Sequence, residues 1–253
     1  MIEQASLSPH ESQSMNASQP LDRKVALVTG ASRGIGFAIA KSLAAMGASL
    51  GLCARDPTPL RSAAAEIERS GGKALAAAAD VSRASEVSSL VQRIERSLGT
   101  IDILINNAGI GYFGPTHEAA EETWNSILDT NLKSVFLLSK AVAPGMIRLQ
   151  HGHIINIASL AGKSAFAGGG IYCASKWGLL GLTQCLAEDL RPHGIRVSAV
   201  CPGSVNTDFS PHAGKDVTKM LQPEDVAHAV ETILTQEPRS FISEILLRPA
   251  QKP

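Results

Sequence analysis

Short apolar runs alternate with longer amphipathic stretches along most of the chain. The first run covers residues 24–29 and ends at a glycine-rich turn, after which apolar residues recur at helical spacing from Ile35 to Met46. Short apolar runs bounded by glycine are typical of buried parallel strands, whereas a spacing of three and four residues is typical of helices. The pattern therefore predicts a strand, a turn and a helix in this order.

The same alternation continues to the end of the chain. The predicted strands cover residues 24–29, 48–53, 73–79, 101–105, 153–159, 195–200 and 244–247. The predicted helices cover residues 35–46, 59–69, 84–98, 123–149, 171–191 and 223–235. Parallel strands need crossover connections, so this order predicts an α/β fold, a doubly wound (Rossmann) seven-stranded parallel sheet with helices on both faces. Pro144 is a candidate kink in the longest helix, and the alanine-rich run 74–79 is expected to be a buried strand.

Length and composition favour one large α/β domain. The 253 residues are 44% hydrophobic, and 23 basic residues balance 23 acidic ones, which argues against nucleic-acid and membrane partners. Residues 1–20 are polar and are expected to be a disordered extension before a single domain over 21–253. The four cysteines form no CxxC pair and are expected to be buried, reduced thiols of a cytoplasmic protein.

The glycine-rich turn after the first strand is a candidate phosphate-binding site. Glycines permit a tight turn and a close approach of the backbone to a pyrophosphate, and a helix N-terminus attracts negative charge. The spacing is G-x3-G-x-G, so a plain strand-to-helix turn remains the alternative. The residues expected to contact the phosphates are Gly30, Ser32, Arg33, Gly34, Ile35 and Gly36.

This turn, with Thr29 before it, resembles that of the short-chain dehydrogenase/reductase family, and the resemblance extends from Leu21 to Leu247. Further motifs of the family follow in the expected order, with Asn106 opening the second of them: Asp80-Val81, Asn107-Ala108-Gly109 and Pro202-Gly203 with Val205 and Thr207. The resemblance implies that the first pair holds the adenine, the second motif lines the cofactor groove and the third contacts the nicotinamide end. It also implies an enzyme with a nicotinamide cofactor, assembled as a homotetramer or homodimer.

The end of the second predicted strand indicates which nicotinamide cofactor binds. Enzymes that use NAD place an acidic residue there for the ribose 2′-hydroxyl, whereas an arginine accommodates the 2′-phosphate of NADP. Here the acidic position is Ala54, the next residue is Arg55, and Arg33 in the turn is also basic. Asp56 lies two positions late and precedes Pro57. We therefore expect NADP(H), with a solvated loop arginine as the alternative for Arg55.

A tyrosine and a lysine four residues apart share one face of the helix predicted over 171–191. These are Tyr172 and Lys176, and Ser159 lies thirteen positions before the tyrosine, which is the family spacing. A tyrosine can protonate a carbonyl oxygen, but its ordinary pKa of about 10 is high, and a nearby ammonium is expected to lower it. By resemblance, Lys176 also binds the nicotinamide ribose, Ser159 binds the substrate oxygen and Asn131 holds a water molecule that links Lys176 to solvent.

Other polar and aromatic residues near these motifs have weaker assignments. His151 and His153 lack partners at metal-ligand spacing, so no metal site is expected. His212 is expected to be an exposed loop histidine, with a substrate contact as the alternative. Ser164, Phe166 and either Tyr112 or Phe113 could line the substrate end. Trp177, Leu180 and Leu186 are expected to serve the core or a subunit contact.

Together these features predict an NADPH-dependent oxidoreductase that reduces a ketone or a 3-oxoacyl carbonyl to an alcohol. The alternatives are an NADP-dependent dehydrogenase of a hydroxy acid or sugar alcohol, and a non-catalytic NADP-binding sensor. Two departures from the family affect the substrate and the assembly. No glycine pair follows the last strand, and the loop over 204–222 is short, which argues for a small carbonyl substrate rather than a long acyl chain.

Overall fold

Seven parallel strands form one sheet in the order β3-β2-β1-β4-β5-β6-β7. The computed structural model describes residues 19–209 and 216–253, so His212 and almost all of the predicted extension over 1–20 lie outside the described residues. The strands are β1 (Val25–Thr29), β2 (Ser49–Ala54), β3 (Lys73–Ala78), β4 (Ile103–Asn106), β5 (Gly152–Ile157), β6 (Ile195–Pro202) and β7 (Glu244–Leu247). The predicted fold class is confirmed.

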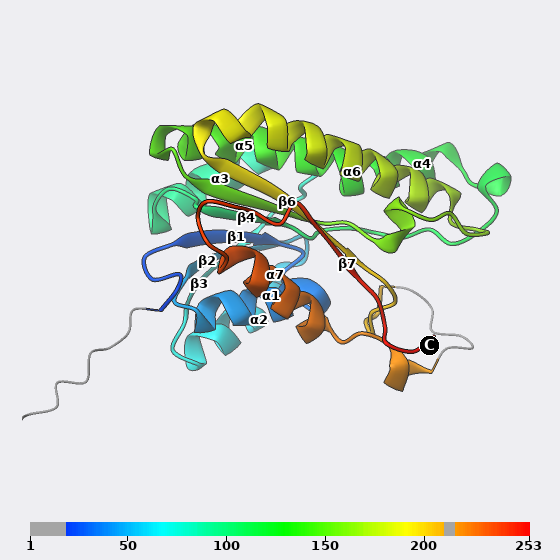
Figure 1. Cartoon of the computed structure of the whole chain (residues 1–253), viewed down its shortest axis with the longest axis horizontal. Coiled ribbons are helices and arrows are strands. Elements are labelled where there is room, and N and C mark those ends of the chain that lie inside the picture. The colour runs from blue at the N-terminus through cyan, green and yellow to red at the C-terminus, as the bar shows by residue number, and fades with distance from the viewer. Residues whose placement is uncertain (1–18, 210–215) are drawn as a thin grey trace, which may run out of the picture.

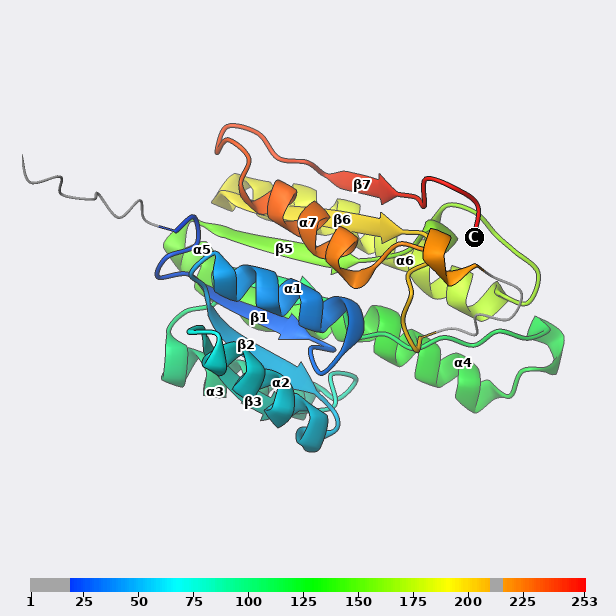
Figure 2. The ribbon, with the colours of Figure 1, turned by 90° about the horizontal axis from the view of Figure 1, so that it is seen from below.

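Helices cover both faces of this sheet. They are α1 (Gly34–Ala45), α2 (Pro57–Arg69), α3 (Ala84–Leu98), α4 (Glu121–Leu128), α5 (Ser134–Leu149), α6 (Gly170–Leu190) and α7 (Pro223–Leu234). Short 3₁₀ turns cover Thr116–Glu118, Leu160–Gly162, Arg191–His193 and Val217–Lys219. Helices α1, α2 and α7 lie on one face, and α3, α5 and α6 on the other (Figures 1 and 2). None of the described helices is both long and apolar enough to span a membrane.

The longest predicted helix is interrupted, but not at Pro144. A π-helical turn over Asp129–Lys133 separates α4 from α5, whereas Pro144 lies inside α5 without ending it. The turn places one extra residue in the helix, and such insertions are frequent at functional sites. Asn131 lies within it and is 1% exposed.

The apolar core forms two layers, one on each face of the sheet. One cluster joins the strands to α1, α2 and α7, and the other joins them to α3, α5 and α6. The buried strand expected over 74–79 is instead an edge strand, because within the described residues β3 pairs with β2 alone and most of its side chains remain partly exposed. The four cysteines are free, but Cys185 is exposed, so the expectation of burial is wrong at that position.

The two halves of the sheet diverge between β1 and β4. The chain runs outward from β1 to β2 and β3, then returns to β4 on the other side of β1. Crossover helices on either side of such a switch point leave a crevice at the carboxyl ends of the strands, where ligands bind in open α/β sheets. In Figure 2 the strand arrows point toward this end of the molecule.

Candidate active site

A cleft of about 1250 Å³ lies at the carboxyl ends of the strands. Pockets for single small ligands usually enclose roughly 300–1,000 Å³, so this cleft has room for a dinucleotide together with a second small molecule. Its walls come from the turn after β1, from the ends of β2, β4 and β5, from α6 and from the loop after β6.

The turn after β1 is held in place by side chains at the end of β4. Gly30 and Gly34 have φ values of +63° and +56°, which favour glycine. The Thr29 hydroxyl donates to the Ile105 carbonyl at 3.2 Å and accepts the backbone N–H groups of Asn107 and Ala108 at 3.0 Å. The Asn107 amide in turn donates to the carbonyls of Thr29 and Gly30, at 3.0 and 3.2 Å. Asn107 and Ala108, predicted to line the cofactor groove, therefore hold the predicted phosphate-binding turn in place through hydrogen bonds.

The beginning of α1 has the electrostatics of an anion site. The helix starts at Gly34, and within the described residues no acidic side chain lies in its first turn and no side chain caps it. Its first N–H groups and the positive end of its dipole therefore remain available beside the cleft. Ser32, Arg33 and Ile35 also line the cleft here. These features fit a pyrophosphate.

The far end of the cleft carries the basic residues expected to contact the adenosine. Arg55 lines the cleft directly after β2 and makes no ion pair within the described part of the chain. Arg33 lies 3.8 Å from the Asp208 carboxylate in an exposed pair, which contributes little to stability. Asp56 accepts the backbone N–H of Thr58 at 2.8 Å and caps α2, so its carboxylate has a structural partner. These basic side chains fit an anionic group of a nucleotide cofactor.

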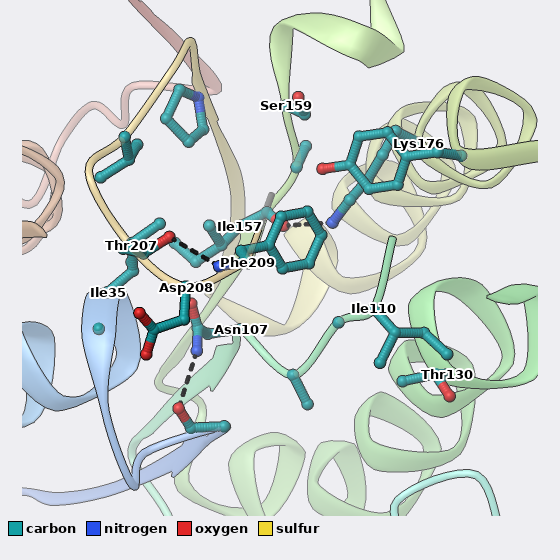
Figure 3. A pocket seen from close by; sticks show the side chains of 18 of the residues that line it. Ile35, Asn107, Ile110, Thr130, Ile157, Ser159, Lys176, Thr207, Asp208 and Phe209 are labelled. Carbon is teal, nitrogen blue, oxygen red and sulfur yellow. Dashed lines mark hydrogen bonds between the residues drawn. The ribbon is translucent and has the colours of Figure 1, made fainter. Parts of the chain in front are cut away.

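Lys176 and Tyr172 lie together on the cleft side of α6. Lys176 is 5% exposed and donates from Nζ to the Ile157 carbonyl at 2.9 Å (Figure 3). Its Nζ lies 5.8 Å from the centre of the Tyr172 ring. Burial lowers the pKa of Lys176 to about 8.

The electrostatics of Tyr172 differ from the sequence-based expectation. Burial raises the pKa of Tyr172 to about 12, and a hydrogen bond with the Ser159 side chain offsets only part of this effect. Ser159 follows the end of β5, where its hydroxyl also accepts the Ala161 N–H at 3.0 Å. The prediction was that a nearby ammonium lowers the tyrosine pKa, whereas burial of the phenolate raises it.

Asn131 acts from behind the cleft wall. Its amide oxygen accepts the Ile110 N–H and its amide nitrogen donates to the Ile110 carbonyl, both at 2.9 Å. The nitrogen also donates to the Ser175 hydroxyl at 3.1 Å, which donates to the Tyr172 carbonyl at 2.7 Å. Asn131 therefore connects the segment after β4 to the α6 turn that carries Tyr172.

Most predicted site residues line the same cleft. All predicted cofactor residues except Gly36 do so, as do Ser159, Ser164, Phe166 and Phe113. Gly36 lies behind the turn, where a Cβ would meet the Gly30 carbonyl oxygen at 2.3 Å. Tyr112 does not belong to the cleft wall, whereas Trp177 is 53% exposed on the outer side of α6. The site also includes four residues that were not predicted, although each lies within two positions of a predicted one: Ile110, Ser175, Asp208 and Phe209.

Comparisons with known proteins agree with this architecture. The model of the family described as short chain dehydrogenase matches residues 24–218. A 3-oxoacyl-(acyl-carrier-protein) reductase of Synechocystis is 37% identical over 231 residues, which cover 88% of this chain and 94% of that protein.

Solved structures are similar over nearly the whole chain. A metagenomic short-chain oxidoreductase in complex with NADP is 44% identical, with a TM-score of 0.83 over 92% of this chain and 100% of that one. An alcohol dehydrogenase from the archaeon Thermococcus sibiricus, complexed with 5-hydroxy-NADP, is 32% identical, also with a TM-score of 0.83, over 91% and 98%. This chain therefore belongs to the short chain dehydrogenase family and is an oxidoreductase of CH–OH and carbonyl groups with an NAD(P)-type cofactor.

Proposed function

We propose that this protein reduces a ketone to a secondary alcohol with NADPH, and that Tyr172 protonates the carbonyl oxygen. The observation that carries the proposal is the gathering of Ser159, Tyr172 and Lys176 in a cleft that is also lined by two arginines, Arg33 and Arg55. When bound, the nicotinamide supplies a hydride to the carbonyl carbon. The proton from Tyr172 completes the alcohol, and solvent returns a proton to the tyrosine.

Each polar group has a role that matches its surroundings. Ser159 binds the carbonyl oxygen as negative charge develops on it. Lys176 uses one N–H on Ile157 and has two further donors for the cofactor ribose. Asn131 is a positioning residue, because its contacts hold Ile110 and Ser175 rather than the reacting atoms.

The protonation of Tyr172 matches the role of proton donor in reduction. Burial raises the pKa of Tyr172 to about 12, so at neutral pH the side chain holds the proton that reduction requires. Oxidation requires the phenolate as a base, which makes the alternative dehydrogenase less favourable at neutral pH. A non-catalytic sensor would not need the catalytic groups Asn131, Ser159, Tyr172 and Lys176. The reductase therefore remains the better interpretation.

Exposed apolar side chains and free cysteines support an assembly and a location for this protein. Large apolar side chains are exposed on α4, α5 and α6, where Trp124, Phe136 and Trp177 are 43%, 47% and 53% exposed. These exposed groups support a homo-oligomer, a dimer or a tetramer. Free cysteines support a reducing compartment such as the cytoplasm. The described strands and helices between Val25 and Leu247 form one sheet and its flanking helices, which supports one domain.

The proposed function is tested with purified protein and a panel of ketones, aldehydes, 3-oxoacyl thioesters, hydroxy acids and sugar alcohols. Reduction is followed by the loss of NADPH or NADH absorbance, and oxidation by its gain. We expect reduction of at least one ketone with NADPH at neutral pH. Turnover of alcohols alone, or of no substrate in either direction, would contradict the reductase.

Cofactor selectivity is expected to depend on Arg33 and Arg55. An arginine bond to a phosphate contributes about 1.5–3 kcal/mol, so two arginines favour NADPH over NADH by roughly a hundredfold or more. We expect the double variant Arg33→Ala/Arg55→Ala to lose most of this ratio through a higher KM for NADPH, with the KM for NADH changed little. The matched control is Arg69→Ala in the last turn of α2, away from the cleft wall. A wild-type preference for NADH would contradict the proposal that Arg33 and Arg55 bind the 2′-phosphate.

The two directions of the reaction are expected to respond oppositely to pH. Reduction needs protonated Tyr172, whose pKa of about 12 keeps the proton in place, and charged Lys176, whose pKa of about 8 marks the loss of its charge. We therefore expect kcat/KM for reduction to stay level from about pH 6 to 7.5 and to fall above about 8. Oxidation of the product alcohol should accelerate as pH rises, because the phenolate becomes more populated. Initial rates in overlapping buffers provide the measurement, and a reduction rate that climbs from pH 7 to 10 would contradict these assignments.

A further inference from the structure

Aromatic residues are scarce in this chain, yet half of its phenylalanines form one cluster that contacts Tyr172. The chain has six phenylalanines, two tyrosines and two tryptophans. Phe113, Phe166 and Phe209, here called the aromatic collar, all line the cleft. The Phe113 ring lies 5.8 Å from Tyr172, 6.3 Å from Phe209 and 6.4 Å from Phe166, and Phe209 lies 5.7 Å from Tyr172.

The collar comes from three separate segments and remains open to solvent. Phe113 follows β4, Phe166 precedes α6, and Phe209 lies in the loop after β6, beside Lys176 and Thr207 in Figure 3. Their exposed fractions are 42%, 47% and 42%. Exposing large apolar rings costs free energy, and when such rings gather in a cleft they mark a binding surface for an apolar ligand.

Two collar rings pack directly against the backbone of a glycine. A Cβ on Gly111 would meet the Phe113 ring at 2.7 Å, and a Cβ on Gly169 would meet the Phe166 ring at 2.4 Å. No side chain other than hydrogen fits at either position while the rings stay in place. The two glycines thus leave the space that these rings occupy, and the positions of the rings depend on them.

Two charged residues lie at the collar end of the described cleft wall, Lys176 and Asp208, which directly precedes Phe209 (Figure 3). The other charged residues that line the cleft are Arg33, Arg55, Asp56 and Asp80. The Asp208 carboxylate faces Arg33 at 3.8 Å, and Lys176 donates to the Ile157 carbonyl. The negative charge of Asp208 beside the collar disfavours a carboxylate or a phosphate on the substrate.

We infer that the aromatic collar binds a flat, uncharged aromatic group next to the carbonyl, so that the substrates are aryl ketones. This inference rests on the proposed function. The aryl ring would pack against Phe113 and Phe209 in stacked or tilted contact, with the carbonyl oxygen toward Tyr172 and Ser159. Aromatic pairs attract each other beyond the effect of buried area, so the collar distinguishes a flat ring from a saturated ring of similar size.

The inference is tested with substrates that differ in one property. Acetophenone and cyclohexyl methyl ketone share the methyl ketone and the ring size, but only the first ring is aromatic. Acetoacetate carries a charge, and the N-acetylcysteamine thioester of acetoacetate represents a carrier-bound 3-oxoacyl group. With NADPH, we expect kcat/KM for acetophenone to exceed that for cyclohexyl methyl ketone by about tenfold. Acetoacetate and the thioester should react more slowly still.

Collar variants show whether these rings cause the preference. Phe113→Leu and Phe209→Leu should each lower the ratio of acetophenone to cyclohexyl methyl ketone about threefold or more, mainly through KM for acetophenone. The matched control is Phe241→Leu, which precedes β7 at the opposite end of the sheet and should keep the wild-type ratio. Equilibrium binding of acetophenone to the complex with NADP⁺, followed by saturation-transfer NMR, gives a readout that does not depend on turnover. Circular dichroism verifies that each variant is folded, and Phe166→Leu on the more exposed ring replaces any that is not.

The outcomes separate this inference from the function on which it rests. If no ketone is reduced, the proposed function fails. If ketones are reduced but the two methyl ketones react equally, or the thioester reacts best, the collar inference is overturned and the reductase stands. A preference for acetophenone that both collar variants retain would also overturn it.

Discussion

Replacing Tyr172 with phenylalanine is expected to lower kcat for ketone reduction by about a thousandfold, the middle of the range for loss of a general acid. The substitution removes one hydroxyl and keeps the ring, so the contacts with Phe113 and Phe209 remain. Tyr172 is 8% exposed, and the volume of its site is nearly conserved. Single-turnover kinetics measure the chemical step, while the affinity for NADPH, measured by cofactor fluorescence, should change less than about threefold.

Tyr112→Phe is the matched control for this variant. It changes the only other tyrosine of the chain, which is not part of the cleft wall, and it should leave kcat within about twofold of wild type. If Tyr172→Phe kept more than a tenth of the wild-type kcat, the proton would have to come from another donor.

The second large effect is expected from Gly36→Ala. A Cβ at this position would lie 2.3 Å from the Gly30 carbonyl oxygen and 2.4 Å from the Asn107 amide nitrogen, so the backbone of the turn must move. We expect the free energy of unfolding to fall by about 3 kcal/mol, at the upper end for overpacking. NADPH binding should weaken as well, because the turn that receives the phosphates is displaced. Urea denaturation and cofactor fluorescence measure the two effects.

Gly181→Ala provides the opposite case on the same chain. Gly181 lies inside α6, and a Cβ there would meet nothing within 4 Å. Alanine favours a helix over glycine by about 0.5–1 kcal/mol, so this variant should be slightly more stable than wild type. Equal stability of the two glycine variants would show that Gly36 is not tightly packed.

Much of the fold could be predicted because its signals are local. Each of the seven strands is an apolar run, each helix has its own periodicity, and glycines mark the ends of several elements. The cleft was predictable for a related reason. Parallel strands bring their carboxyl ends together, so motifs placed after β1, β4 and β6 meet although they are far apart in sequence.

The remaining features depend on neighbours that no local pattern reveals. β3 is an edge strand because no described strand pairs with its outer side. Its run of alanines nevertheless has the pattern that is typical of a buried strand. The raised pKa of Tyr172 depends on how deeply the assembled cleft buries it. Phe209 reaches Tyr172 only because the loop after β6 folds back over the cleft, and the distance in sequence gives no sign of this.

The π-helical turn over Asp129–Lys133 has a consequence for how this chain can change in evolution. Each residue of an α-helix advances the side chains by about 100°, so deleting one residue to regularise this turn would rotate α4 by that angle relative to α5. Asn131 would turn away from Ile110 and Ser175 even if every amino acid type were kept. At this point the spacing of residues matters to the site as much as their identity, and we expect single-residue gaps to be tolerated far less here than substitutions on the exposed face of α4.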